Sequence, residues 1–330
     1  MAGEQQIKEA KEAAKRIVLT QGNKYIKELL RSNKAKIGKN KEEFLKNLLE
    51  AIDDGKLNKA KIDEWLGKTE GWGNQHIYLF KTPQIEPNTI PDLIKASETP
   101  DILDKSVNYE FPDELTLKVA TLDTTEDLSL EWREGNDSWV RAKAKDYRNE
   151  IDGEEYEFRA YREKSERRVV RFRWVFKKMY CAVYISHANE KGVHEEILNQ
   201  VWEDMAALGV VKGPLTKISL SNAFRKMNDK PELKVNSVRM AVDGGHVNLV
   251  ATAPQSGIHD VQAIRQAKLG IDAKQFTTSD GMFHFNPKNT AKLENNLKVE
   301  GSGADSRIRI WAQCVKSDVD RIVEKIHGWS

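Results

Sequence analysis

The spacing of apolar residues divides the chain into an amino-terminal part with a helical period and a middle part with the period of a strand. In the first part, Ile7, Ala10, Ala14 and Ile17 recur at intervals of three and four residues. This spacing places them on one face of a helix. It predicts helical structure over residues 5–67. The amphipathic segments expected after the first helix lie at about 24–32, 41–52 and 58–66.

The middle of the chain alternates between apolar and polar positions, which is typical of half-buried strands. After a first strand at 76–80, the alternation predicts strands at about 115–119, 126–133, 138–147, 155–163, 168–177 and 179–186. Polar, glycine-containing stretches at 134–137 and 152–153 are expected to form turns between them. A helix is expected at about 190–208.

The last third of the chain contains segments with the apolar spacing of a helix and segments with that of a strand. It predicts helices at about 218–227, 259–268 and 317–327, a hairpin across Asp243-Gly244-Gly245, and strands at 281–286 and 307–315. Five of the nine prolines fall between residues 82 and 112, which indicates a linker. We therefore predict an α+β fold with an antiparallel sheet. Its expected parts are a helical module at 1–80, a proline-containing linker at 81–112, a β-rich domain at 113–210 and a smaller α+β domain at 211–330.

Charge is segregated along the chain, although the formal net charge is only +2. Residues 1–50 hold 12 Lys and Arg against 7 Asp and Glu, and residues 159–178 hold 9 against 2. Residues 91–130 hold 3 against 10. Blocks of one sign create local fields that the whole-chain average hides. The two basic blocks are therefore candidate contacts for a polyanion.

The stretch RVVRFRWVFKK, residues 168–178, combines a strand pattern with cations. A period of two places Phe172 and Trp174 on one face, and Arg171 and Arg173 on the other. Like charges on neighbouring strands repel, and a bound polyanion relieves that repulsion and releases counterions. We therefore expect a basic sheet face that binds phosphates with little base specificity. Its expected members are Arg141, Lys143, Lys145, Arg159, Tyr161, Arg171, Arg173 and Lys177.

Other interpretations of this face stay open. Ion pairs with the acidic segment 91–130 could neutralise it, or that segment could cover the face until nucleic acid displaces it. The segment could also be an ordinary solvated linker. The carboxylates concerned are Asp101, Asp104, Glu110, Asp113, Glu114, Asp123, Glu126 and Asp127.

A second candidate surface lies in the segment KYIKELLRSNKAKIGKNKEEFLKNLLEAI of the amino-terminal module. Leu29 and Leu30 would lie on a first helix, Ile37-Gly38 in an extended link, and Lys41 at the start of a second helix. The buried stripe expected on the second helix consists of Phe44, Leu45, Leu48 and Leu49. In these features the segment, at about residues 22–55, resembles the SAP domain, a helix–extended–helix module that binds DNA.

The resemblance implies DNA contact through Lys36, Lys39 and Lys41, together with the backbone amides that open the second helix. A helix N-terminus offers a phosphate unpaired N–H donors and the positive end of the helix dipole. The alternative is a small helical module that docks on a protein, with its lysines in solvent.

Motifs for catalysis are sparse. Cys181 and Cys314 are the only cysteines, and their separation argues against a disulfide framework or a zinc knuckle. Seven histidines show no metal-ligand spacing, and His246 and His284 are interpreted as structural. No run of about 18 apolar residues predicts a membrane span.

These patterns favour a non-enzymatic, intracellular protein of the cytoplasm, nucleoid or nucleus. We expect it to need no cofactor or metal and to bind nucleic acid, with DNA favoured over RNA. The alternative is a scaffold or subunit of a complex acting on DNA, with a protein partner or a second copy of the chain. A metal-dependent nuclease built on Glu155, Glu157 and Lys164 is the weakest candidate, because Lys164 falls on the opposite face of a regular strand.

Overall fold

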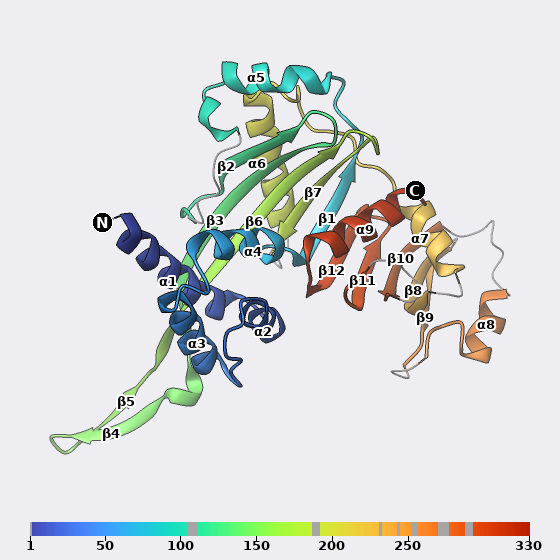
Figure 1. The fold of residues 1–330 in the computed structure, drawn as a ribbon. Coiled ribbons are helices and arrows are strands. Elements are labelled where there is room, and N and C mark those ends of the chain that lie inside the picture. Colours follow the sequence, from blue (N-terminus) through green and yellow to red (C-terminus); the bar gives the residue numbers. More distant parts are fainter. Residues whose placement is uncertain are drawn as a thin grey trace. The chain divides into compact units, whose positions relative to one another are not determined.

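The structure is a computed structural model of the 330-residue chain (Figure 1). It describes residues 2–103, 111–186, 192–230, 233–242, 245–252, 256–269, 277–287 and 293–330. The chain divides into two compact units, one made of Met1–Gln75 with Ser219–Ser330 and the other of His76–Ile218. We call these the split unit and the central unit. The expected α+β fold with antiparallel pairing is confirmed.

Four helices build the amino-terminal part of the split unit, close to where the apolar spacing predicts them. They are α1 (Ala2–Thr20), α2 (Asn23–Ser32), α3 (Lys41–Asp53) and α4 (Lys59–Thr69). Each buries one apolar face, for example Leu29 and Leu30 on α2 and Phe44 and Leu48 on α3. Leu45 and Leu49, which were expected in the buried stripe, are only partly buried.

The carboxy-terminal part of the split unit is a sheet with helices. Its elements are α7 (Ser221–Asn228), β8 (Lys234–Val242), β9 (Gly245–Val250), α8 (Gln262–Leu269), β10 (Thr277–Phe285), β11 (Leu297–Ser302), β12 (Arg307–Gln313) and α9 (Lys316–His327). The strands pair antiparallel in the order β12-β11-β10-β8-β9, and we call them the carboxy-terminal sheet. Phe224 of α7 stacks on Phe283 of β10, with ring centroids 5.9 Å apart. This contact places α7 on the apolar face of the sheet.

The central unit contains the predicted run of strands and one long helix. Its elements are β1 (Gly73–Phe80), η1 (Pro87–Thr89), α5 (Ile90–Ala96), η2 (Pro100–Ile102), β2 (Thr116–Asp123), β3 (Asp127–Arg141), η3 (Lys143–Lys145), β4 (Tyr147–Ile151), β5 (Glu154–Phe158), β6 (Tyr161–Val175), β7 (Tyr180–Ser186) and α6 (Val193–Ala207). The main sheet has the order β2-β3-β6-β7-β1, and β4 and β5 form a separate hairpin.

Helix α6 covers the apolar face of this sheet. Phe172 and Trp174 lie on that face, as predicted, and they belong to the same buried cluster as Trp202 of α6. Trp132 of β3 donates from its indole nitrogen to Asp204 of α6 at 2.6 Å. Arg171 and Arg173, which alternate with these aromatic residues, therefore lie on the face of the sheet that α6 does not cover.

The sequence prediction was wrong about the turn at 134–137, because β3 continues unbroken through it. The register runs from Asp127↔Val175 to Arg141↔Tyr161, so that β3 and β6 are both 15 residues long. Gly135 does not form a turn. It allows the segment that contains Phe111 and Pro112 to pack closely against β3. Its N–H donates to the carbonyl of Pro112 at 2.7 Å, and a Cβ at this position would lie 2.9 Å from the Cβ of Phe111.

Among the described residues, no helix is both long and apolar enough to cross a membrane.

Candidate nucleic-acid interface

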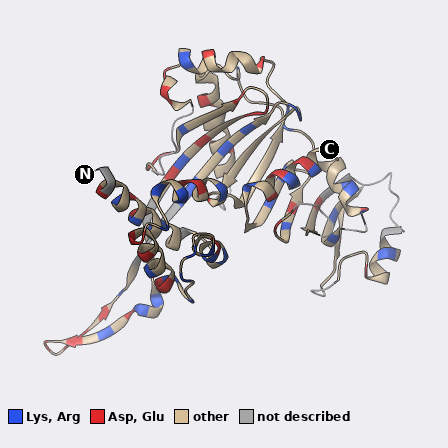
Figure 2. Cartoon of the chain, viewed as in Figure 1, with Lys and Arg blue, Asp and Glu red and all other residues tan. Residues whose placement is uncertain are grey.

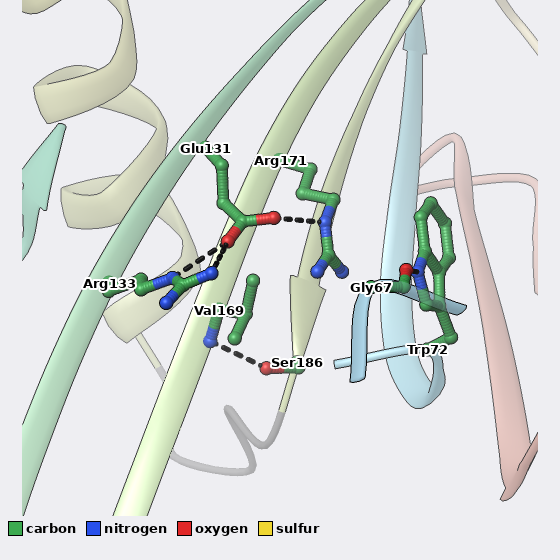
Figure 3. A network of polar contacts seen from close by, with 7 residues as sticks. All are labelled: Gly67, Trp72, Glu131, Arg133, Val169, Arg171 and Ser186. Carbon is green, nitrogen blue, oxygen red and sulfur yellow. Dashed lines mark hydrogen bonds and ion pairs between the residues drawn. The ribbon is translucent and has the colours of Figure 1, made fainter. Parts of the chain in front are cut away.

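Glu131 on β3 is the centre of the polar face of the central sheet (Figure 3). Its carboxylate accepts from Nε of Arg133 on the same strand at 2.7 Å, and from Nε of Arg171 on β6 at 2.7 Å. The side chains of Arg133, Arg171 and Glu131 are 2 %, 8 % and 15 % exposed. Buried charges are stable in a protein only when they are paired and hydrogen-bonded. Arg171 is therefore already paired with the carboxylate of Glu131.

Burial alone would raise the pKa of Glu131. The charges of Arg171 and Arg133 and the hydrogen bonds from both outweigh burial, and they hold the pKa below its usual value of 4.5. The carboxyl group of Glu131 therefore stays ionised near neutral pH, and its negative charge balances the two buried guanidinium groups.

Three further cations on or next to this strand pair are also paired with carboxylates. Arg173 donates from Nε to Asp127 at 2.5 Å, and Arg168 pairs with Glu134 at 2.5 Å. Lys177 pairs with Glu126. Figure 2 shows positions of both signs side by side on β3 and β6. The expectation of an unneutralised basic face is therefore wrong for Arg171, Arg173 and Lys177.

The strand β3 and the turn before it supply these carboxylates. Glu126 and Asp127 belong to the acidic segment, so the ion-pairing interpretation describes this face best. Asp123 instead accepts from the hydroxyl and N–H of Thr125. Asp104 and Glu110 lie outside the described residues, and the idea that they cover the face remains a hypothesis.

The remaining expected members do not gather with Arg171 and Arg173. Tyr161 starts β6, about 40 Å along the strand from Arg173 at 3.3 Å per residue. Arg141 pairs with Asp146 at 2.6 Å and lies 5.5 Å from the ring centroid of Tyr161.

Lys143 and Lys145 belong to the short η3 helix and are exposed. The expected strand at 138–147 is thus wrong beyond Arg141, and the alternation that placed both lysines on one sheet face does not exist there. Arg159 lies 3.9 Å from Glu157, at the edge of ion-pair distance.

Strands β4 and β5 project from the ends of β3 and β6 as a hairpin arm, residues 147–158 (Figure 1). The register Tyr147↔Phe158 and Asn149↔Tyr156 places the aromatic side chains on one face. Arg148, Glu150, Glu155 and Glu157 occupy the other face. Tyr147 stacks on Phe158 with centroids 4.8 Å apart, yet Tyr147 and Tyr156 remain 57 % and 43 % exposed.

The lysines at the start of α3 have a different environment. Lys34, Lys36, Lys39 and Lys41 form a group that we call the lysine loop, and residues 32–41 contain no acidic residue. All four are exposed. Lys41 donates from Nζ to the carbonyl of Leu19 at 3.4 Å. Within the described residues, Lys34, Lys36 and Lys39 have no carboxylate at ion-pair distance.

Side chains already cap the N-terminus of α3. The Glu43 N–H donates to Asn40 Oδ1 at 2.9 Å, and the Lys39 N–H donates to Glu43 Oε2 at 2.9 Å. Such a cap satisfies donors that would otherwise receive a phosphate. The ammonium groups of the lysine loop, more than the helix amides, are therefore the groups available to an anion.

Sequence reasoning missed Lys34, which follows α2 in the left-handed region at φ 54°. It also missed the strand β11 and, with it, the polar face of the carboxy-terminal sheet. The alternation in RIRIW, residues 307–311, repeats the cation–apolar pattern of β6 and was the available signal.

No group of three or more His, Cys, Asp or Glu among the described residues could hold a metal ion. Burial raises the pKa of both cysteine thiols, which makes them poor nucleophiles. Comparison with known proteins finds no matching family model and no matching curated protein.

The central ion pairs predict a large effect of Glu131→Gln on stability. The substitution leaves two buried guanidinium groups without their carboxylate, so urea denaturation should show a loss of about 3–5 kcal/mol in the free energy of unfolding. Glu126→Gln is the matched control, because it breaks an exposed pair that solvent screens and should leave the midpoint almost unchanged. Equal small effects of both substitutions would contradict a structural role for Glu131.

The lowered pKa of Glu131 adds a pH dependence with a definite sign. Its contribution to stability is complete above the usual pKa of 4.5 and is lost as the pH falls through the lowered pKa of the folded state. The difference in unfolding free energy between wild type and Glu131→Gln should therefore shrink as the pH falls below about 4.5. A difference that stays constant down to acid unfolding would show that Glu131 is not ionised in the fold.

Proposed function

We propose that the protein binds nucleic acid, with duplex DNA favoured, through phosphate contacts made by the lysine loop. The observation that carries this proposal is the contrast between two sets of cations. The expected sheet arginines are neutralised by carboxylates, whereas Lys34, Lys36 and Lys39 are exposed with no carboxylate at ion-pair distance. The resemblance of residues 22–55 to the SAP domain supports the same surface.

Binding of this kind has little sequence specificity. Ammonium groups act as point charges on phosphate oxygens and position the protein without contact to base edges. The capped N-terminus of α3 adds few further donors. Affinity should therefore come mainly from release of counterions, and it should fall steeply with salt.

A salt titration tests this function. Fluorescence anisotropy with a labelled duplex should give a slope of log affinity against log salt of about −3 to −4 for four phosphate contacts. Lys34→Ala/Lys36→Ala/Lys39→Ala should reduce the magnitude of the slope by about 2.7, because each lost contact removes about 0.9. Lys41 is left in place because it contacts α1.

The matched control is Lys56→Ala/Lys61→Ala/Lys68→Ala, which changes the net charge equally within the same helical module. Lys56 and Lys68 are paired with Asp54 and Glu64, and Lys61 donates to a backbone carbonyl. The control should keep the wild-type slope. If both triple variants lose the same affinity, net charge alone drives binding and the lysine loop is not the site.

The hairpin arm favours a second candidate function, self-association. Its aromatic face is exposed, and two strands alone are only marginally stable in water. Five carboxylates and one arginine lie between residues 148 and 157. The lysine loop of a second copy has the complementary charge and an apolar contact in Ile37, which is 41 % exposed.

Analytical ultracentrifugation tests this second function. The wild type should form a dimer that Ile151→Ser/Tyr156→Ser abolishes, because both side chains lie on the aromatic face. Arg148→Ser/Glu155→Ser is the control on the opposite face, and it leaves the net charge unchanged. A wild type that stays monomeric at every concentration would overturn self-association without affecting the DNA-binding proposal.

A further inference from the structure

The carboxy-terminal sheet has a polar face opposite the face on which α7 packs. Buried Phe283, Phe285, Val299 and Ile310 occupy the α7 side, so the residues between them point the other way. We call this second side the open face. It carries Lys234 and Arg239 on β8, Asp280, Met282 and His284 on β10, Lys298 and Glu300 on β11, and Arg307, Arg309 and Trp311 on β12.

The register aligns four of these side chains in one row across the sheet. His284 is opposite Lys234 on one side and Lys298 on the other. The pair Val299↔Ile310 brings Lys298 opposite Trp311. Neighbouring strands lie about 4.8 Å apart, so the row spans about 14 Å. It contains no carboxylate.

Lys234 and Lys298, one on each side of His284, produce a positive potential at the middle of the row. Burial lowers the pKa of His284, and the charges of Lys234 and Lys298 lower it further. The carboxylates of the open face lie in neighbouring rows. Asp280 is opposite Arg239, and Glu300 accepts from the indole nitrogen of Trp311 at 3.0 Å.

Trp311 ends the row with an accessible aromatic ring. The side chain is 41 % exposed, and the hydrogen bond to Glu300 fixes the direction of the indole. The guanidinium of Arg309 lies over the ring at 3.6 Å from its centroid, so a cation–π contact covers one face of the indole. The ammonium of Lys298 lies 5.5 Å from the same centroid.

We propose that the open face is a binding site for single-stranded nucleic acid. Phosphates lie along Lys234, His284 and Lys298, and an unpaired base stacks on the surface formed by Trp311 and Arg309. Cations beside an exposed aromatic are the combination by which sheet surfaces hold single strands. A duplex hides the faces of its bases, so this site differs in ligand from the lysine loop and goes beyond the function proposed above.

Binding of fluorescein-labelled (dT)15 to the full chain tests the site. Trp311→Ala should weaken binding about 5- to 150-fold, the range expected when one stacked base is lost. Trp311→Phe should stay within a few-fold of wild type, because it keeps an aromatic face. Lys234→Ala/Lys298→Ala should reduce the magnitude of the salt slope by about 1.4.

Two controls separate this site from the lysine loop and from general loss of fold. Trp139→Ala removes a tryptophan that is 70 % exposed in the central unit, and it should leave the affinity unchanged. In the background of Lys34→Ala/Lys36→Ala/Lys39→Ala, the effect of Trp311→Ala on (dT)15 should persist. If the triple substitution left duplex binding unchanged while this effect persisted, only the lysine loop would be refuted.

Three results would overturn the proposal. Folded Trp311→Ala, checked by circular dichroism, could bind (dT)15 as tightly as the wild type. An abasic strand of equal length could bind as well as (dT)15, which would show a general anion patch without stacking. Poly-glutamate could bind with the same dependence on Trp311, which would identify an acidic protein segment as the ligand.

Discussion

The pairing of Glu131 with Arg133 and Arg171 is the interaction on which the account of this protein depends. All three side chains are largely buried, and a buried charge without a partner costs far more than its pairing gains. The register of β3 against β6 satisfies this requirement by bringing carboxylates of one strand to arginines of the other. A strand that looks like a polyanion-binding surface in the sequence is thereby a structural element, and its charges hold the sheet together.

Two other groups of cations, the lysine loop and the row from Lys234 to Trp311, differ in geometry. The lysine loop is a short, exposed set of point charges beside a capped helix, which suits the phosphates of a duplex. The row from Lys234 to Trp311 combines charge with an aromatic ring, which suits a strand whose bases are unpaired. A chain with both could hold a duplex and an adjoining single strand, and each contact would raise the effective concentration of the other.

The elements were more predictable than the surfaces. The spacing of apolar residues located α2, α3 and most strands. The alternation of side chains along β6 correctly placed Phe172 and Arg171 on opposite faces of the central sheet. The alternation of side chains along one strand does not show which residue of a neighbouring strand lies opposite a given residue, because the register between strands depends on contacts distant in the sequence. Glu131 therefore stayed unrecognised as the partner of Arg171. The turn predicted at 134–137 was wrong for a related reason. Gly135 leaves room for Phe111, a contact that the local sequence does not show.

Chemical footprinting with and without duplex DNA tests the central claim most directly. Acetylation of lysines and phenylglyoxal modification of arginines, both read by mass spectrometry, report which cations are accessible and which become protected. The account predicts that Arg171 and Arg173 react slowly in the free protein, and that DNA protects Lys34, Lys36 and Lys39. Rapid reaction of Arg171 and Arg173, with protection by DNA confined to them, would contradict it.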